Sequence, residues 1–225
     1  MGSLGGRTSA FWSFLGLLTL AGPAAQATPV ASVGPPASAQ QAKPAVSADT
    51  YAMLQWVLAA GDHHGMPFAI VDKKAARLFL FDAAGQLLGA SPALLGLMPG
   101  DAGSPQTGRR DVTQIPPTER TTPAGRFASE PGRNLQGEEV VWVDYDAGLA
   151  IHRLRPAPSS QRRPQRMLAL EPAERRISLG CVVVPVSFYQ SVVAPVLGRQ
   201  RGVVYVLPET QTLQSLFGRP QRRLG

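Results

Sequence analysis

Three short apolar segments follow one another from Phe68 to Pro92, and this pattern restricts the fold more than any other part of the chain. They read FAIVD, ARLFLFD and QLLGASP, and KKA and AAG separate them. Short apolar runs bounded by turn-forming residues are typical of antiparallel strands joined by tight turns. The sequence therefore predicts a β-meander at the start of a mostly β domain with a few short helices.

Further strands and two helices are predicted around this meander. EEVVWVDYD and GLAIHRL flank the turn YDAG, and the apolar run Val140–Val143 indicates a strand covered on both faces and central in its sheet. GVVYVLP reads as a final strand. Helical spacing predicts one helix from Asp49, its candidate N-cap, to the stop at Gly61, and another from about Pro185 to Gly198.

Two polar segments have no predicted regular structure. The stretch 96–127 is rich in Gly and Pro, and a loop this long in a compact domain tends to be functional or mobile. The stretch 155–167, RPAPSSQRRPQRM, is too polar and too broken by proline to be regular.

The first residues are typical of a secretory signal peptide. Arg7 precedes an apolar run from Phe11 to Ala21, and the small-residue site Ala25-Gln26-Ala27 follows. The alternative is a membrane anchor, but the run is shorter than the roughly 20 apolar residues that cross a bilayer. We therefore expect cleavage after residue 27, export across the inner membrane to the periplasm or cell wall, and no integral membrane segment in the mature chain.

The remaining chain divides by composition. Residues 28–48 are rich in Pro, Ala, Ser and Gln and read as a flexible tether. Residues 49–215 are long enough for a single domain with a real core, and residues 216–225 form a basic tail.

The formal net charge of +7 indicates acidic partners such as phospholipid or cell-wall polymer. Export argues against nucleic acid as the partner. The alternative is that the arginine-rich loops and the tail are simply solvated.

Cys181 is the only cysteine of the chain, so it cannot take part in an internal disulfide. It is either a buried, inert side chain or a reactive thiol. A reactive thiol needs a base, and His152 ends a predicted strand where the chain enters a polar loop. His63 and His64 could hold a metal or move a proton, but with only Asp62 beside them a solvated linker is the simpler interpretation. The sequence predicts no metal and no cofactor.

Gly180 directly precedes the thiol. A residue without a Cβ lets the backbone bend sharply, so that amides of Gly180 and Cys181 could face a developing oxyanion. The dipole of the helix near Pro185 would favour a thiolate. An ordinary turn glycine is the alternative.

These segments together resemble the exported L,D-transpeptidases, whose catalytic domain is of the YkuD type. The resemblance runs from about Pro67 to Leu207, and its most specific parts are Thr122-Pro123-x-Gly125 and Ser178-x-Gly180-Cys181. In the family the second of these motifs usually has the sequence S-H-G-C. It implies a single-domain β-sandwich that transfers an acyl group from a peptidoglycan stem peptide to an amine.

Carried over to this chain, the resemblance implies a role for each residue of the site. Cys181 matches the nucleophile, His152 the general base, and the backbone carbonyl of Arg153 the group that orients the base. Amides near Gly180 and Cys181 match the oxyanion site, and Ser178 and Leu179 are the expected substrate-binding residues.

Three features depart from the family pattern. Leu179 stands in place of the motif histidine, and Val183 and Val184 stand where many members carry an arginine or asparagine. His152 and Cys181 are also 29 positions apart (181 − 152), wider than usual, although an insertion near 155–166 could loop out without moving its ends.

Three functions therefore stay open at this point. The first is an exported cysteine acyltransferase acting on peptidoglycan stem peptides. The second is a catalytically silent protein of the same fold that binds cell-wall polymer, and the third is a basic polyanion-binding module.

Overall fold

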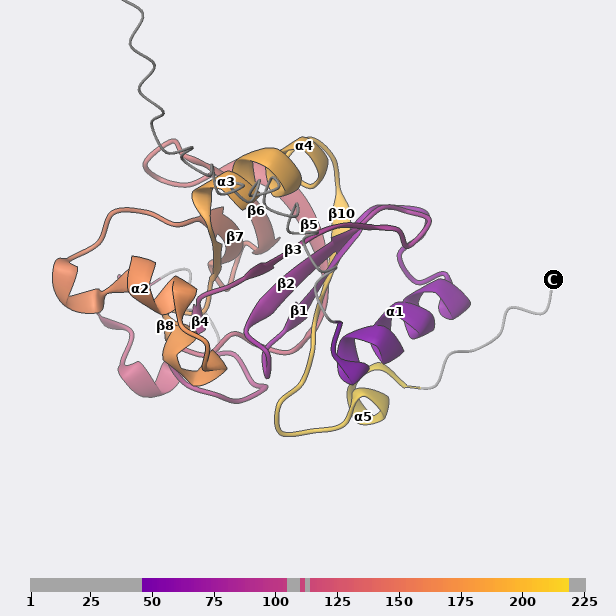
Figure 1. Ribbon diagram of the computed structural model, residues 1–225, viewed down its shortest axis with the longest axis horizontal. Coiled ribbons are helices and arrows are strands. Elements are labelled where there is room, and N and C mark those ends of the chain that lie inside the picture. Colours follow the sequence, from indigo (N-terminus) through magenta and orange to yellow (C-terminus); the bar gives the residue numbers. More distant parts are fainter. Residues whose placement is uncertain (1–45, 105–109, 112–113, 219–225) are drawn as a thin grey trace, which may run out of the picture. The chain divides into compact units, whose positions relative to one another are not determined.

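The computed structural model describes residues 46–104, 110–111 and 114–218. The predicted signal peptide, most of the predicted tether and the last seven residues of the basic tail, 219–225, lie outside these described residues. Within them the chain is mostly β with a few short helices (Figure 1), so the predicted fold class is confirmed.

The strands are β1 (Phe68–Asp72), β2 (Arg77–Phe81), β3 (Leu87–Pro92), β4 (Leu95–Gly96), β5 (Gly125–Arg133), β6 (Glu139–Asp144), β7 (Leu149–Arg153), β8 (Arg176–Ser178), β9 (Val182–Val184) and β10 (Gly202–Val206). The helices are α1 (Ala48–Ala60), α2 (Arg163–Leu168), α3 (Val186–Phe188), α4 (Ala194–Val196) and α5 (Leu213–Phe217). Shorter turns are η3 (Pro117–Glu119), η4 (Ser159–Gln161), η5 (Pro172–Arg175) and the π-helical η6 (Tyr189–Val193).

One eight-stranded sheet organises the domain, in the order β3-β2-β1-β10-β5-β6-β7-β9, and β4 and β8 form a small second sheet. The predicted antiparallel meander of β1, β2 and β3 is confirmed. Beyond the end of β3, Leu94 exchanges two backbone hydrogen bonds with Val183 of β9, with N···O distances of 2.8 and 2.9 Å. Because this bridge joins the two ends of the sheet, the sheet curls into a nearly closed barrel.

The curled sheet encloses the main core. This core takes side chains from both halves of the sheet, such as Val71, Leu80, Val141 and Val184, together with Val193 of η6. A second apolar cluster lies on the other face, where α1 and α5 cover β1 and β10. Trp56 of α1 and Phe217 of α5 are in ring contact there, with centroids 5.9 Å apart.

Several predicted elements have the predicted positions. α1 ends at Gly61, whose φ of 62° is left-handed, and β6 lies between β5 and β7 as expected of a central strand. The N-cap prediction is wrong, because the side chain of Ser47, not Asp49, accepts the hydrogen bond from the Thr50 amide. Asp49 lies in the first turn, where its charge still suits the helix dipole.

The structure also contains elements that the sequence did not reveal. β5 lies partly inside the predicted 96–127 loop, and α5 lies at the chain's end. The segment predicted to be irregular, 155–167, contains η4 and most of α2. It belongs to the crossover between β7 and its parallel neighbour β9, and parallel strands need a connection of a dozen residues or more. The wide spacing of His152 and Cys181 is thus the length of this crossover.

In the part of the chain that the structure describes, every helix is too short or too polar to cross a bilayer.

Candidate active site

Cys181 and His152 both line one cavity of about 620 Å³. Its walls come from residues between Gly103 and Pro123, the 133–136 turn, β6 and the β6–β7 turn, the β7–β9 crossover and the Ser178–Cys181 segment. The structure therefore brings together the two residues that the sequence singled out.

The register of the β7–β9 ladder explains why these two side chains meet. Ile151 pairs with Val182 and His152 with Val183, so Cys181 lies beside Ala150 at the start of the ladder. Successive side chains of a strand point to opposite faces of the sheet. Ile151 and Val182 point into the core, so His152 and Cys181 lie on the opposite face, toward the cavity. His152 and Cys181 are then diagonal neighbours on the cavity face, about 8 Å apart between Cβ atoms from ordinary strand spacing and rise.

The His152 ring is held in one orientation. Its Nδ1 lies 2.8 Å from the backbone carbonyl oxygen of Arg153, and because a carbonyl only accepts, Nδ1 carries the proton. Nε2 is then left with a free lone pair. Burial, reinforced by the charge of Arg155, lowers the pKa of His152 to about 4. The imidazole is therefore neutral at pH 7 and able to accept a proton.

Cys181 is held as a thiol rather than a thiolate. Burial raises the pKa of its sulfur, and hydrogen bonds from the backbone of Ala150 together with the charges of Arg155 and Arg163 oppose this rise only in part. The sulfur donates to the carbonyl oxygen of Gly148 at 3.3 Å, and it makes no hydrogen bond to His152. Cys181 as a whole residue is nonetheless partly exposed, and it lines the cavity.

The expectation that Cys181 is already a thiolate before it reacts is therefore wrong. The helix dipole that was expected to stabilise it is absent from the site, because β9 separates Cys181 from the first turn of α3. A neutral thiol beside a neutral imidazole must instead transfer its proton as it reacts.

A tight turn precedes Cys181 and requires glycine. Gly180 has a φ of 142°, and a Cβ built on it would lie 3.0 Å from the carbonyl oxygen of Thr121. The Gly180 amide donates to Ser178 Oγ at 3.1 Å, and Ser178 Oγ donates to the Cys181 carbonyl oxygen at 2.7 Å.

This geometry changes two expectations about the turn. The Gly180 amide is engaged by Ser178 and is not aimed at an oxyanion in the cavity, so of the expected pair the Cys181 amide remains. Ser178 borders the cavity, but its hydroxyl holds the turn closed rather than offering a contact to substrate. Leu179 also lines the cavity and is partly exposed.

Thr122 of the Thr-Pro-x-Gly motif supports this turn from behind. Its fully buried hydroxyl donates to the Gly180 carbonyl oxygen at 2.7 Å and accepts from the Gly96 amide at 2.8 Å. Gly96 is needed there because a Cβ would lie 2.5 Å from the Thr122 amide nitrogen. The motif therefore positions the cysteine turn from a distance of 58 residues in sequence.

The arginines of the crossover are cavity residues that sequence reasoning missed. Arg155 and Arg163 line the cavity, and both act electrostatically on Cys181. They lie in the segment taken for a solvated loop. The one available signal was their position between His152 and Cys181. Val183 and Val184, by contrast, are buried apolar side chains, as their sequence suggests.

An aromatic pair forms another part of the wall. Trp142 and Tyr145 line the cavity and make an edge-to-face contact with centroids 5.0 Å apart, and Tyr145 is largely exposed. Leu135, also on the wall, is fully exposed. An apolar rim thus lies beside the cationic part of the cavity.

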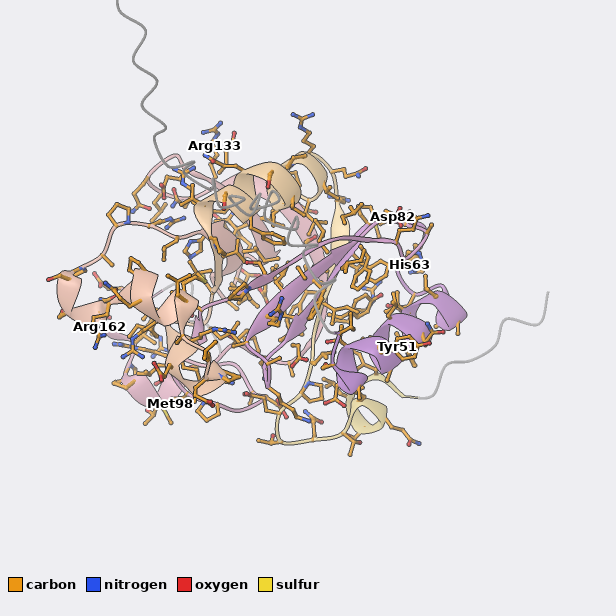
Figure 2. The ribbon with its side chains drawn as sticks, in the orientation of Figure 1. Tyr51, His63, Asp82, Met98, Arg133 and Arg162 are labelled. Carbon is orange, nitrogen blue, oxygen red and sulfur yellow. The ribbon has the colours of Figure 1, made fainter. Side chains whose placement is uncertain are left out.

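The other two histidines lie outside this cavity. His63 is buried, with Nε2 3.0 Å from the carbonyl oxygen of Ala83, next to Asp82 in the β2–β3 turn (Figure 2). The interpretation as a solvated linker is therefore wrong for His63 and correct for the exposed His64.

No protein-family model and no curated protein matches this chain. Solved structures do match. The catalytic domain of an L,D-transpeptidase from E. faecium aligns over 62% of this chain and 95% of its own length, with 18% identity and a TM-score of 0.36. The carbamoyl enzyme of Ldtfm with avibactam aligns over 63% of this chain and 49% of its own, with 18% identity and a TM-score of 0.36.

The helical cell shape determining protein Pgp2 from Campylobacter jejuni aligns over 74% of this chain and 58% of its own, with 13% identity and a TM-score of 0.40. This chain thus spans about half the length of two of these three proteins. At this distance the matches carry no argument about activity, which has to come from the residues of the site.

Proposed function

We propose that the protein is a cysteine-dependent acyltransferase of the L,D-transpeptidase type that acts on peptidoglycan stem peptides. The observation that supports this most strongly is the pairing of β7 with β9, which puts the partly exposed residue Cys181 and the oriented, neutral imidazole of His152 in the wall of the same cavity. The sequence resemblance over Thr122-Pro123-x-Gly125 and Ser178-x-Gly180-Cys181 supplies the substrate class.

The proposed reaction has two halves. In the first, the Cys181 thiol rotates away from Gly148 and gives its proton to Nε2 of His152 while sulfur attacks a peptide carbonyl carbon. The carbon–nitrogen bond then breaks, the leaving amine takes the proton from Nε2, and a thioester on Cys181 remains. In the second half an acceptor amine attacks the thioester, loses a proton to Nε2, and the thiol is restored.

The structure offers specific support for each of these roles. Arg153 supplies the carbonyl that keeps Nδ1 protonated and Nε2 free. The developing oxyanion is assigned to the Cys181 amide, since the Gly180 amide is already engaged. Leu179 is assigned to substrate contact because it is a partly exposed side chain at the cavity wall.

A second function has its own observation in favour. Cys181 and His152 are both neutral and are not hydrogen-bonded to each other, and arginines line the cavity. A protein that binds cell-wall polymer without reacting would need no more than this. In either case we propose that the domain works outside the cytoplasm, after removal of residues 1–27 and at the end of the 28–48 tether.

A carbapenem separates the two functions, because its strained amide is a reactive acyl donor for a competent thiol. We expect intact-mass analysis to show one covalent adduct on the wild-type protein. The adduct should be absent from Cys181→Ser and formed at least about a hundredfold more slowly by His152→Ala, as general-base catalysis typically contributes this much.

The control is a thiol assay on the same samples. If iodoacetamide alkylates Cys181 in the folded wild-type protein and the carbapenem still leaves no adduct, the thiol is accessible but not competent. That result would reject the acyltransferase and favour the silent polymer-binding protein.

A further inference from the structure

The β7–β9 crossover carries an arrangement of charges that the acyl-transfer steps do not use. Arg155 lies two residues after the end of β7, and Arg163 is the first residue of α2. Both are partly buried and both line the cavity that contains Cys181. The segment thus contributes two guanidinium groups to the cavity that contains the reacting sulfur, and both act on Cys181 through their charge.

The ion pairs around these groups leave positive charge in excess. Glu138 accepts from Arg153 Nη2 at 2.9 Å through one carboxylate oxygen and lies 2.6 Å from Arg155 Nε through the other. Among the residues that the structure describes, no carboxylate pairs with Arg163, whose Nε donates to the side-chain oxygen of Gln161 at 2.6 Å. Arg153, Arg155, Arg163 and Glu138 together carry a net charge of +2 (3 − 1), and His152 is neutral. Asp146 and the paired Arg110 and Glu119 line other parts of the same cavity.

The effect of this charge reaches both reacting groups. Arg155 lowers the pKa of His152, and Arg155 and Arg163 both oppose the rise in the pKa of Cys181. Burial and the nearby Arg155 charge lower the pKa of Arg163, whereas a thiolate at Cys181 would raise it. Arg163 is a partly buried guanidinium near another cation, and among the described residues its side chain donates to the amide oxygen of Gln161, so it is well suited to bind an anionic group.

We propose that Arg155 and Arg163 form a carboxylate-binding subsite that selects acyl donors with a free carboxylate close in the chain to the carbonyl that Cys181 attacks. This deepens the proposed acyl transfer and rests on it for the identity of the donor. It also explains how the chain can bind an anionic substrate although apolar valines occupy positions 183 and 184. The binding of a carboxylate next to Cys181 can be measured without any acyl transfer.

Two alkylating reagents that differ in charge test the subsite. Iodoacetate and iodoacetamide react with the same sulfur by the same displacement, but only iodoacetate carries a carboxylate. The measured quantity is the rate constant for iodoacetate divided by the rate constant for iodoacetamide, normalised by the same ratio for free cysteine. In wild-type protein at low salt we expect this normalised ratio to be about 10. Any change in the ionised fraction of Cys181 alters both rates equally and cancels in this ratio.

Variants locate the effect. Arg163→Gln should lower the normalised ratio by about tenfold, and Arg163→Lys should restore part of it, because a point charge attracts a carboxylate without the bidentate geometry. Arg162→Gln is the matched control, since the neighbouring Arg162 is exposed and is not among the residues that line the cavity. It should leave the ratio unchanged.

A wild-type ratio equal to that of free cysteine, or a ratio that falls equally in Arg162→Gln and Arg163→Gln, would overturn the subsite. This result is distinguishable from failure of the proposed function. A raised, Arg163-dependent ratio without a carbapenem adduct would keep the carboxylate subsite and reject acyl transfer. A carbapenem adduct together with a normalised ratio near one would support acyl transfer and reject the carboxylate subsite.

Discussion

At the scale of single residues, the site depends on two side chains that burial keeps uncharged. His152 is only 8% exposed and its Nδ1 is hydrogen-bonded to the Arg153 carbonyl, so a proton on Nε2 would be poorly solvated. Burial raises the pKa of Cys181 instead of lowering it, because the charged form of a thiol is the deprotonated one. The pair is thus held in the protonation states from which general-base catalysis can begin.

The lowered pKa of His152 predicts a loss of stability in acid. The unfolded chain binds a proton at His152 below about pH 6.5, whereas the folded chain binds it only below about pH 4. The contribution of His152 to stability therefore falls as the pH drops through this window, by about 3 kcal/mol in total.

Urea unfolding of wild type and His152→Asn between pH 7 and pH 4 measures this contribution. The variant should lose about 3 kcal/mol less than wild type over the window, whatever its stability at pH 7. His64→Asn controls for the removal of an exposed histidine. Parallel losses in wild type and His152→Asn would contradict the buried, neutral imidazole.

At the scale of elements, one threonine connects three segments behind the nucleophile. The Thr122 hydroxyl links the Gly96 amide at the end of β4 to the Gly180 carbonyl in the turn between β8 and β9. Both partners are buried, and a buried polar group that loses its partner is costly. The position of Cys181 thus depends on a loop far away in sequence.

Thr122→Val tests this link, since it replaces the hydroxyl by a methyl group of similar shape. We expect a loss of about 3 kcal/mol in the free energy of unfolding, because a donor and an acceptor are left unsatisfied. The alkylation rate of Cys181 by iodoacetamide should change as well. Thr122→Ser, which keeps the hydroxyl, should retain most of the stability, and equal losses in both variants would contradict the argument.

At the scale of the whole domain, a buried lysine joins segments that are distant in sequence. Lys73, whose side chain is fully buried just after β1, donates to Asp101 and to the Thr122 carbonyl oxygen, each at 3.0 Å. Asp101 in turn accepts from the amides of Glu209 and Thr210 beyond β10. Burial lowers the pKa of Lys73, but its hydrogen bond to Asp101 and the nearby charge of Glu209 oppose this.

Replacing Lys73 should therefore destabilise the entire domain. Lys73→Met leaves Asp101, whose side chain is only 6% exposed, without its cation, and we expect a loss of about 3 to 5 kcal/mol in urea unfolding monitored by circular dichroism. Lys74→Met is a control at the next position. Its pair with Asp49 is exposed, with 56% and 43% of the two side chains accessible, so it should cost less than about 1 kcal/mol. Similar losses of unfolding free energy in both variants would show that the buried Lys73 contacts stabilise the domain no more than the exposed Lys74 pair does.

Local patterns in the sequence were enough for much of the β framework. The meander, the central position of β6 and the stop of α1 at Gly61 each depend on neighbouring residues, and all three are confirmed. β5 could not be found this way, because it contains Pro131 and Gly132 and few apolar residues. It is a strand because β10 and β6 hydrogen-bond to its two edges.

The sequence by itself determined that this chain has one thiol, a histidine at a strand end that could serve it, and a glycine that lets the backbone turn sharply between β8 and β9. Only the tertiary structure decided that β7 and β9 are neighbours, that burial keeps both reacting groups neutral, and that two arginines of the crossover line the cavity that contains the sulfur. The physical reason is range. Turns and strand patterns arise from adjacent residues, whereas strand partners, burial and electrostatic fields depend on residues that only folding brings together.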